Sequence, residues 1–259
     1  MTGLEGFVAQ FGVAALAGAA LGMAAGGFAK GVVGFALPLI GLSVLGSFLP
    51  YEVAVALLIM PTLVSNVFQS LRNGIAAAWG SLRAFWRLNL ILVVMIALSA
   101  QLVLRLPQQL LFALLGLFVT AFGLAQILGW QPRLPPGRCG LVETLVALVG
   151  GFFGGISGIW GPPVIMYLLA ARVPKIEMIR AQSLSFLLGS LVLLFAHLRS
   201  GVLDAVTLPA STWLVVPTML AMFAGYRVQD RLDQDLFRKV TLAVLVLAGL
   251  NLLRRGLGV

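Results

Sequence analysis

Gly150-Gly-Phe-Phe-Gly-Gly-Ile-Ser-Gly-Ile-Trp-Gly-Pro-Pro163 interrupts a run that is otherwise continuously apolar, and the fold of the chain follows from this interruption. A related stretch, Gly26-Gly-Phe-Ala-Lys-Gly-Val-Val-Gly-Phe-Ala-Leu-Pro38, lies 124 residues earlier in the chain. Glycine permits backbone angles that break a helix and allows a ligand to approach closely. Proline in the first turn of a helix costs no hydrogen bond. Each stretch is therefore predicted to be a break between two helices.

The residues around these breaks indicate a membrane protein. The chain is 61% hydrophobic and 10% charged, whereas a soluble domain carries about 25% charged residues to face water. The apolar runs are continuous and rich in leucine, alanine, valine and glycine, without the alternation that a membrane barrel requires. The fold class is therefore predicted to be all-α and polytopic, with the lipid bilayer as its surroundings.

The net charge of +9 does not indicate a nucleic-acid partner. The basic residues occur singly or in pairs between apolar runs and form no dense stripe. They are typical of topogenic charges in short loops. The single cysteine excludes an internal disulfide. Because the first apolar segment follows no basic region, it is expected to remain in the mature protein.

The chain is predicted to consist of two similar halves. Three further pairs of matching residues follow in the same order: Pro50 and Pro174, Leu71–Gly74 and Leu198–Gly201, and Arg105–Gln108 and Arg231–Gln234. A linker rich in proline and glycine, Gln131–Arg138, separates the halves. We therefore divide one integral membrane domain into a first repeat, residues 1–135, and a second repeat, residues 136–259.

Each half contains five apolar segments. They are expected at residues 7–25, 32–49, 53–71, 84–104 and 109–130, and at 140–153, 160–171, 178–198, 208–226 and 236–253. The last three of each half have the length of about 20 residues that spans a bilayer. The first two segments of the second half are shorter, and we interpret the pair as a hairpin of half-helices around a glycine-rich tip.

The distribution of basic residues favours inverted repeats. If the hairpin returns to its starting side, one face receives twelve basic residues: Arg72, Arg83, Arg87, Arg133, Arg138, Arg172, Lys175, Arg180, Arg227, Arg231, Arg238 and Lys239. The opposite face then receives only Arg105, Arg199, Arg254 and Arg255. This arrangement obeys the positive-inside rule and places both termini outside the cytoplasm. Inverted repeats with broken helices are typical of transporters that bind their substrate near the midplane.

The two breaks are predicted to bind an anion. The start of a half-helix offers free N–H groups and a positive dipole end, here at Ser157, Gly158, Trp160 and Gly161. Lys30 lies in the first break, and a charge at membrane depth indicates a function. The candidates at the breaks are Lys30, Gly31, Gly34, Pro38, Ser157, Gly158, Trp160, Gly161 and Pro162. The alternatives are that the glycines allow tight helix packing and that Lys30 reaches an interface.

Polar residues in later segments add to this set. Asn66 and Gln69 share a helical face in the first half, and Gln182 and Ser183 begin the equivalent segment of the second. They either line the pathway or connect helices. His197, the only histidine, stands at a segment end beside Arg199 and is expected at the membrane interface rather than in a proton relay. Glu52 and Glu143 lie near segment starts, where stabilisation of a helix N-terminus explains them at least as well as proton coupling does.

These features resemble the TauE/SafE family of sulfite and organosulfonate exporters. The resemblance rests on the paired glycine-proline breaks, on Arg180-Ala181 and on His197–Asp204, and it extends over nearly the whole chain. It implies about eight helices and transport of sulfite, thiosulfate-like or sulfonate anions, outward from the cytoplasm. Lys30 departs from the glycine-rich form of the first break in that family.

The sequence thus predicts a secondary transporter of a small anion in the bacterial inner membrane, working by alternating access around the breaks. No nucleotide motif is present, so no cofactor is expected. The alternatives are a non-transporting scaffold, an importer of a different anion, or an intramembrane enzyme. One histidine argues against a metal enzyme. Besides the anion and the bilayer, a second copy of the chain remains open as a partner.

Overall fold

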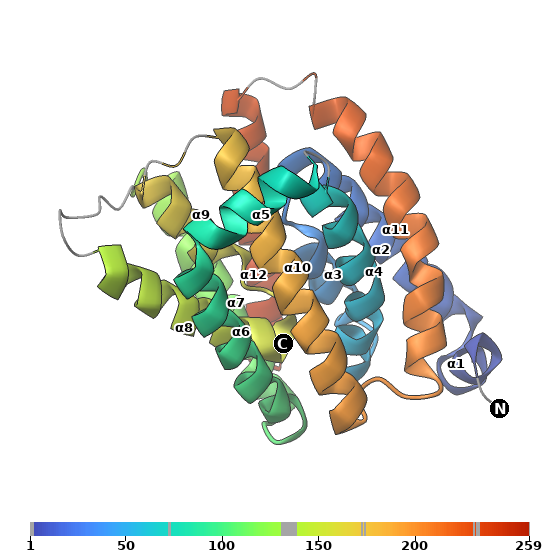
Figure 1. Ribbon diagram of the computed structural model, residues 1–259. Coiled ribbons are helices and arrows are strands. Elements are labelled where there is room, and N and C mark those ends of the chain that lie inside the picture. Colours follow the sequence, from blue (N-terminus) through green and yellow to red (C-terminus); the bar gives the residue numbers. More distant parts are fainter. Residues whose placement is uncertain are drawn as a thin grey trace.

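The structure, a computed structural model, describes residues 3–71, 74–130, 139–171, 173, 175–229, 231 and 234–258. Every regular element in these ranges is a helix (Figure 1), which confirms the all-α prediction. The first repeat contains α1 (Leu4–Phe11), α2 (Val13–Val33), α3 (Leu37–Leu45), α4 (Tyr51–Leu71), α5 (Ile75–Ala84), α6 (Trp86–Ser99), η1 (Ala100–Leu104) and α7 (Gln108–Ile127). The second contains α8 (Cys139–Ser157), α9 (Gly161–Ala170), α10 (Lys175–Ser200), α11 (Thr207–Gln229) and α12 (Gln234–Gly256).

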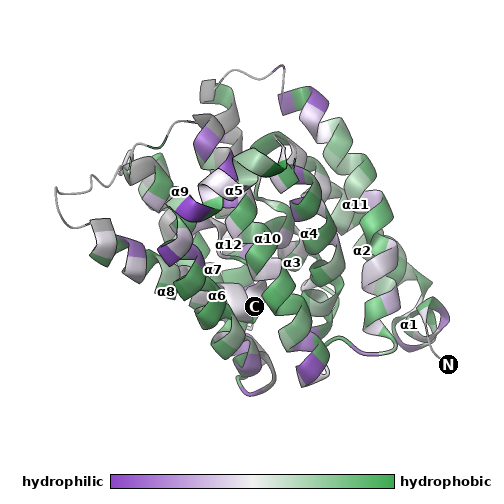
Figure 2. Ribbon diagram, in the orientation of Figure 1, coloured by the Kyte–Doolittle hydropathy of each residue, from purple (hydrophilic) through white to green (hydrophobic). Residues whose placement is uncertain are grey.

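Several of these helices have the length and composition to cross a membrane. Among the described residues, 5 helices qualify, and the bent pair α5 and α6 raises the number to 6. The five are α2, α4, α8, α10 and α11. Apolar residues cover the sides of the molecule, while many hydrophilic residues lie near helix ends (Figure 2). The chain is therefore an integral, multi-pass membrane protein.

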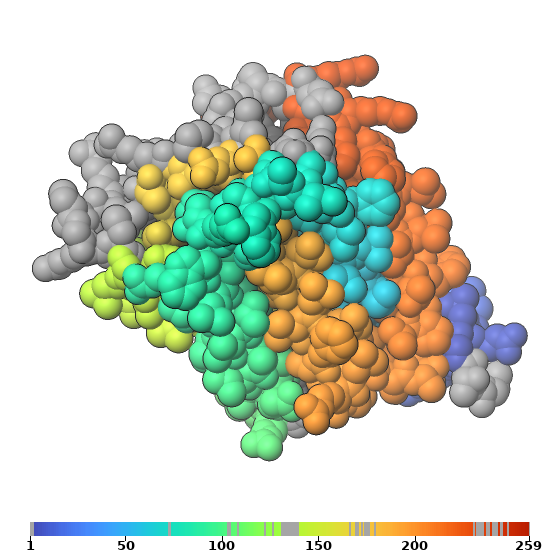
Figure 3. All heavy atoms as spheres, viewed as in Figure 1, coloured from blue at the N-terminus to red at the C-terminus, as the bar shows by residue number. Residues whose placement is uncertain are grey.

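Helices at corresponding places in the two repeats have corresponding neighbours. α2 packs on α11, and its counterpart α8 packs on α6. α4 packs on its own counterpart α10, as α7 does on α12. In Figure 1, α4 rises to α5 at the top, whereas α10 descends to the loop before α11 at the bottom. Figure 3 shows the cyan surface of α4 beside the orange surface of α10 and α11. Counterparts thus run in opposite directions.

The helix breaks are shorter than the sequence predicted. Only residues 34–36 and 158–160 leave the helical conformation, so most of the glycines lie on α2 and α8. The expected hairpin of two half-helices was wrong in its first member, because α8 has 19 residues and is long enough to span. α3, with 9 residues, and α9, with 10, are the half-helices.

Close helix packing explains the glycines that remain helical. A Cβ atom on Gly27 or Gly31 of α2 would lie less than 3.0 Å from backbone oxygens of α11. A Cβ atom on Gly151 or Gly155 of α8 would likewise overlap α6 and the residues that follow it. A helical glycine costs about 1 kcal/mol relative to alanine, and backbone contact between helices offsets that cost. The packing interpretation therefore holds for these positions.

Glu143 and Asp204 stabilise helix N-termini. Glu143 of α8 accepts a hydrogen bond from the backbone N–H of Leu88 at 3.0 Å, in the first turn of α6. Asp204 accepts from the N–H groups of Val206 and Thr207 at 2.8 and 2.7 Å, before α11. Partial burial raises the pKa of Asp204, but these hydrogen bonds to the charged form outweigh burial and lower it overall. Both carboxylates complement a positive helix end.

A side chain from α11 replaces the backbone donor that Pro61 lacks within α4. Proline cannot donate to the carbonyl of Leu57, one turn earlier. The hydroxyl of Ser211 donates to that carbonyl at 3.1 Å and accepts from the N–H of Met60 at 3.1 Å. Ser211 is fully buried. The turn of α4 around Pro61, next to Thr62, is thereby connected to α11.

Replacing Ser211 with alanine is expected to destabilise the protein by about 1–2 kcal/mol, because it removes the donor to the buried carbonyl of Leu57. Changing Pro61 to alanine restores the donor to Leu57, so the cost of Ser211→Ala should shrink in that background. Thermal unfolding of the four proteins in detergent measures both effects. Equal costs in the two backgrounds would contradict this role of Ser211.

Candidate anion site

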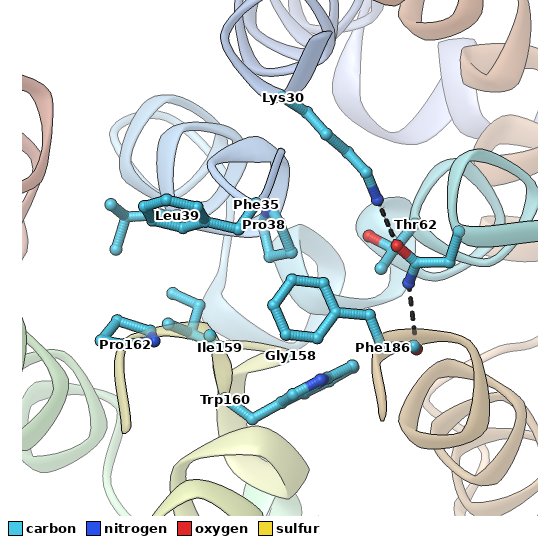
Figure 4. A pocket seen from close by; sticks show the side chains of 12 residues that line it. Lys30, Phe35, Pro38, Leu39, Thr62, Gly158, Ile159, Trp160, Pro162 and Phe186 are labelled. Atoms are coloured by element: carbon cyan, nitrogen blue, oxygen red, sulfur yellow. Dashed lines mark hydrogen bonds between the residues drawn. The ribbon is translucent and has the colours of Figure 1, made fainter. Parts of the chain in front are cut away.

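A small cavity lies where the two helix breaks meet α4 and α10. Six residues of each repeat line it: Lys30, Phe35, Pro38, Leu39, Thr62, Asn66, Gly158, Ile159, Trp160, Gly161, Pro162 and Phe186 (Figure 4). The volume open to the centre of a water molecule is about 10 Å³, which is the room for one water. The structure therefore shows the cavity in a closed form.

Equivalent positions of the two predicted repeats line the cavity. Three pairs of residues 124 positions apart contribute to its walls from both sides: Phe35 and Ile159, Pro38 and Pro162, and Thr62 and Phe186. Asn66 of α4 donates to Ser190 of α10, its own counterpart at the same offset, at 3.4 Å. The site is thus at the interface of the repeats, where inverted transporters hold their substrates.

Lys30 supplies the positive charge of the site. Its side chain is 1% exposed and runs inward from α2 (Figure 4), not outward to an interface. The ammonium group donates to Oδ1 of Asn66, whose amide in turn donates to the carbonyl of Phe186 at 3.0 Å. In the part of the chain that the structure describes, no carboxylate pairs with Lys30. A buried charge without a counter-ion is costly and therefore indicates a ligand of opposite charge.

Two further residues that line the cavity each carry a buried donor without an acceptor. Nε1 of the Trp160 indole and the hydroxyl of Thr62 are buried, and neither has a hydrogen-bond partner among the described residues. Lys30 retains ammonium protons beyond the one that Asn66 accepts. Because buried donors are nearly always paired, this set indicates a ligand with several acceptor oxygens.

Two helix N-termini also face the cavity. α3 begins at Leu37 with Pro38 in its first turn, and α9 begins at Gly161. First-turn N–H groups lack acceptors within the helix, and the dipole makes this end positive. The prediction that the N–H of Gly158 is free was wrong, because it donates to Gly154 at 2.7 Å. Ser157 also has a local role, since its hydroxyl donates to Phe153 at 2.6 Å and accepts from Ile159 at 3.2 Å.

The two repeats exchange a large and a small side chain at this site. Lys30 corresponds to Gly154, and Ala36 corresponds to Trp160, at the offset of 124 residues. The Trp160 ring fills the space beside Gly154 and Gly189, where a Cβ atom would lie within 3.0 Å of it. Trp160 packs edge-on against Phe186 at 5.7 Å between ring centroids. The first repeat alone thus supplies the cationic side chain of the site, and the second alone supplies the indole.

The structure brings most, but not all, of the predicted residues to the cavity. Lys30, Pro38, Asn66, Gly158, Trp160, Gly161 and Pro162 line it. Gly31 packs against α11, and Ser183 is buried on α10 outside the lining. Gln69 and Gln182 lie beside Gly34, next to the cavity. The sequence analysis missed the walls formed by Phe35, Leu39, Ile159 and Phe186, although the repeat offset links Leu39 to Pro163 and Phe186 to Thr62.

His197 is buried inside the protein. It lies in the last turn of α10, as expected for a segment end, but its side chain is fully buried. Its place at a helix end beside Arg199 agrees with the sequence, and its level relative to the membrane interface stays a prediction. Neighbouring helices cover this end of α10, which a single amphipathic segment does not reveal.

The comparison with protein families agrees with these features. The family model described as sulfite exporter TauE/SafE matches residues 16–252. Searches of curated proteins and of solved structures gave no match. The matched range includes both helix breaks and every residue of the cavity.

Proposed function

The chain belongs to the sulfite exporter TauE/SafE family, and from this premise we propose that it exports a small sulfur oxyanion or organosulfonate as a secondary transporter. The family implies a membrane transporter of sulfur anions rather than an enzyme. The observation that carries the proposal is the buried ammonium of Lys30 at the meeting point of two helix breaks, without a carboxylate partner in the described residues.

The donor set supports a sulfur oxyanion as the substrate. Sulfite and a sulfonate group each present several acceptor oxygens at one face, and Lys30, Thr62 and Trp160, which all line the cavity, each carry a donor group. Charge-assisted hydrogen bonds from the ammonium group contribute most of the affinity. The apolar walls of Phe35, Leu39 and Phe186 exclude water, which strengthens these interactions. An organic substituent on the sulfur would contact the same walls.

Alternating access requires the closed cavity to open on each side in turn. At about 10 Å³ it is too small for a sulfite ion, so the two repeats must separate around it. The half-helices α3 and α9 have their N-termini at the cavity wall, and they belong to opposite repeats. Rocking of one repeat against the other would expose the fixed site to one face and then the other.

The same proposal includes the orientation in the inner membrane. The described basic residues Arg83, Arg87, Arg180 and Arg227 lie on helices whose ends gather at the top of Figure 1. The positive-inside rule assigns this arginine-rich face to the cytoplasm. Both termini would then lie outside it.

Purified protein in liposomes provides the test. Vesicles loaded with sulfite should release it with saturable kinetics, and thiosulfate and small sulfonates should compete according to their affinity. Liposomes without protein, and liposomes with a Lys30→Met variant, serve as controls. If the wild-type protein gives no saturable flux of any of these anions, the transport proposal fails and a scaffold role becomes the better interpretation.

A further inference from the structure

A second polar cluster lies one helical turn from the cavity, at the first helix break. Gln69 of α4 stands three residues after Asn66, and its amide donates to the carbonyl of Gly34 at 2.9 Å. Nε2 of Gln182, from α10, lies 4.0 Å from the place of a Cβ atom on Gly34. Both glutamines are buried, with 7% and 4% of their surface exposed. Two side chains from different repeats therefore converge on the end of α2.

Each glutamine retains a polar atom without a partner. Oε1 of Gln69 and Nε2 of Gln182 are buried and have no hydrogen bond to any residue that the structure describes. An unpaired buried amide group costs about 1–3 kcal/mol. A packing role alone would be served by an apolar side chain at less cost. The cluster therefore indicates a ligand that these atoms contact at some stage.

The opposite end of the cavity has no such polar atoms. At the offset of 124 residues, Gln69 corresponds to Leu193 and Gln182 to Leu58, and both leucines are buried. Gly34 corresponds to Gly158, and both have a positive φ, 92° and 72°. The nearest atom to a Cβ on Gly158 is Cδ2 of Leu193 at 3.6 Å, where Gly34 has Gln69 at 3.3 Å. Thus amide side chains lie beside the turn at Gly34, whereas a leucine side chain lies beside the equivalent turn at Gly158.

The polar end faces the arginine-rich side of the molecule. Gln69 lies near the C-terminal end of α4, and Gln182 near the start of α10, two residues after Arg180. Both helix ends are at the top of Figure 1, beside α5 with Arg83. An anion entering from this side meets the cluster before it reaches Lys30.

We propose that Gln69 and Gln182 form a second anion subsite, through which the substrate passes between the arginine-rich face and the Lys30 cavity, while Leu193 seals the opposite end. The inference rests on the proposed function and adds the route of the anion. Nε2 of Gln182 donates to an oxygen of the anion, and Oε1 of Gln69 accepts from a water that accompanies it. The two amides thus replace part of the hydration shell of the anion, one helical turn before the anion reaches the ammonium group of Lys30.

Thiol labelling tests this route without depending on sulfite flux. The variant Gln182→Cys, in a Cys139→Ser background, is treated with methanethiosulfonate reagents in everted and in right-side-out membrane vesicles. One reagent carries a sulfonate and the other a trimethylammonium group. The matched control is Leu193→Cys in the same background. The Nε2 atom that Gln182→Cys removes has no partner among the described residues.

In everted vesicles, which expose the cytoplasmic face, the sulfonate reagent should modify Gln182→Cys about tenfold faster than the cationic one, because Lys30 lies close by. Added sulfite should slow this labelling. Leu193→Cys should react slowly with both reagents from either face. Labelling of Leu193→Cys at the rate of Gln182→Cys, no labelling of Gln182→Cys, or a faster reaction with the cation would overturn the subsite.

A second measurement tests the subsite even if the cysteine variant does not fold. Gln182→Leu should lower kcat/KM for sulfite flux about tenfold, whereas Gln101→Leu, at an exposed position of η1, should leave it unchanged. Unchanged kcat/KM in Gln182→Leu would argue against the subsite while leaving the transport function in place. Absence of flux in the wild-type protein would instead reject the function, and the labelling pattern would still show whether the polar route exists.

Discussion

Replacing Lys30 with methionine is expected to weaken sulfite binding about 100-fold, or by about 2.7 kcal/mol. Methionine keeps most of the length of the side chain but removes the only cation among the residues that line the cavity. The donors of Thr62 and Trp160 and the N-termini of α3 and α9 remain, so weak binding should persist. Isothermal titration of the purified protein with sulfite measures the change in Kd.

The stability of this variant separates a ligand-binding role from a structural one. A lysine that is 1% exposed is costly to bury, so its removal should leave the Tm unchanged or raise it. Lys239→Met, the same change at an exposed position of α12, serves as the matched control and should alter neither Kd nor Tm. A Lys30→Met protein with unchanged affinity, or one that no longer folds, would contradict the assignment of Lys30 to the anion.

Changing Gly31 or Gly155 to alanine is expected to destabilise the protein by about 1–3 kcal/mol each, because the added methyl group forces two helices apart. The Cβ on Gly31 would overlap the backbone of Met222 and Gly225, and the Cβ on Gly155 would overlap Ser99 and Ile96. Thermal unfolding in detergent, followed by circular dichroism, measures the loss. The effect should be similar at the two positions, since they belong to equivalent helix pairs.

Gly80→Ala provides the matched control for these two changes. Gly80 lies on α5, and no atom would come within 4 Å of its Cβ. Alanine should therefore stabilise that helix by about 0.5–1 kcal/mol through its lower unfolded-chain entropy. Should Gly31→Ala behave like Gly80→Ala, the contact between α2 and α11 would be looser than the structure shows.

The composition and the internal repetition of the sequence were enough to predict the helical membrane fold and the location of the cavity. Continuous apolar runs require helices in lipid, because every backbone group must be paired there. The repeated glycine-proline stretches located the cavity, since Pro38 and Pro162 mark the starts of α3 and α9 at its wall. The singular Lys30 stood out for the same reason, as a charge at membrane depth has to have a partner.

The tertiary structure alone decided what each glycine does and where each polar atom points. Gly31 and Gly34 are similar in sequence, yet one packs against α11 and the other turns the backbone with a φ of 92°. Only contacts between distant segments distinguish these roles, because glycine serves close packing and positive φ equally well. Likewise, Gln69 and Gln182 are 113 residues apart, and the antiparallel packing of α4 on α10 is what brings them to one turn.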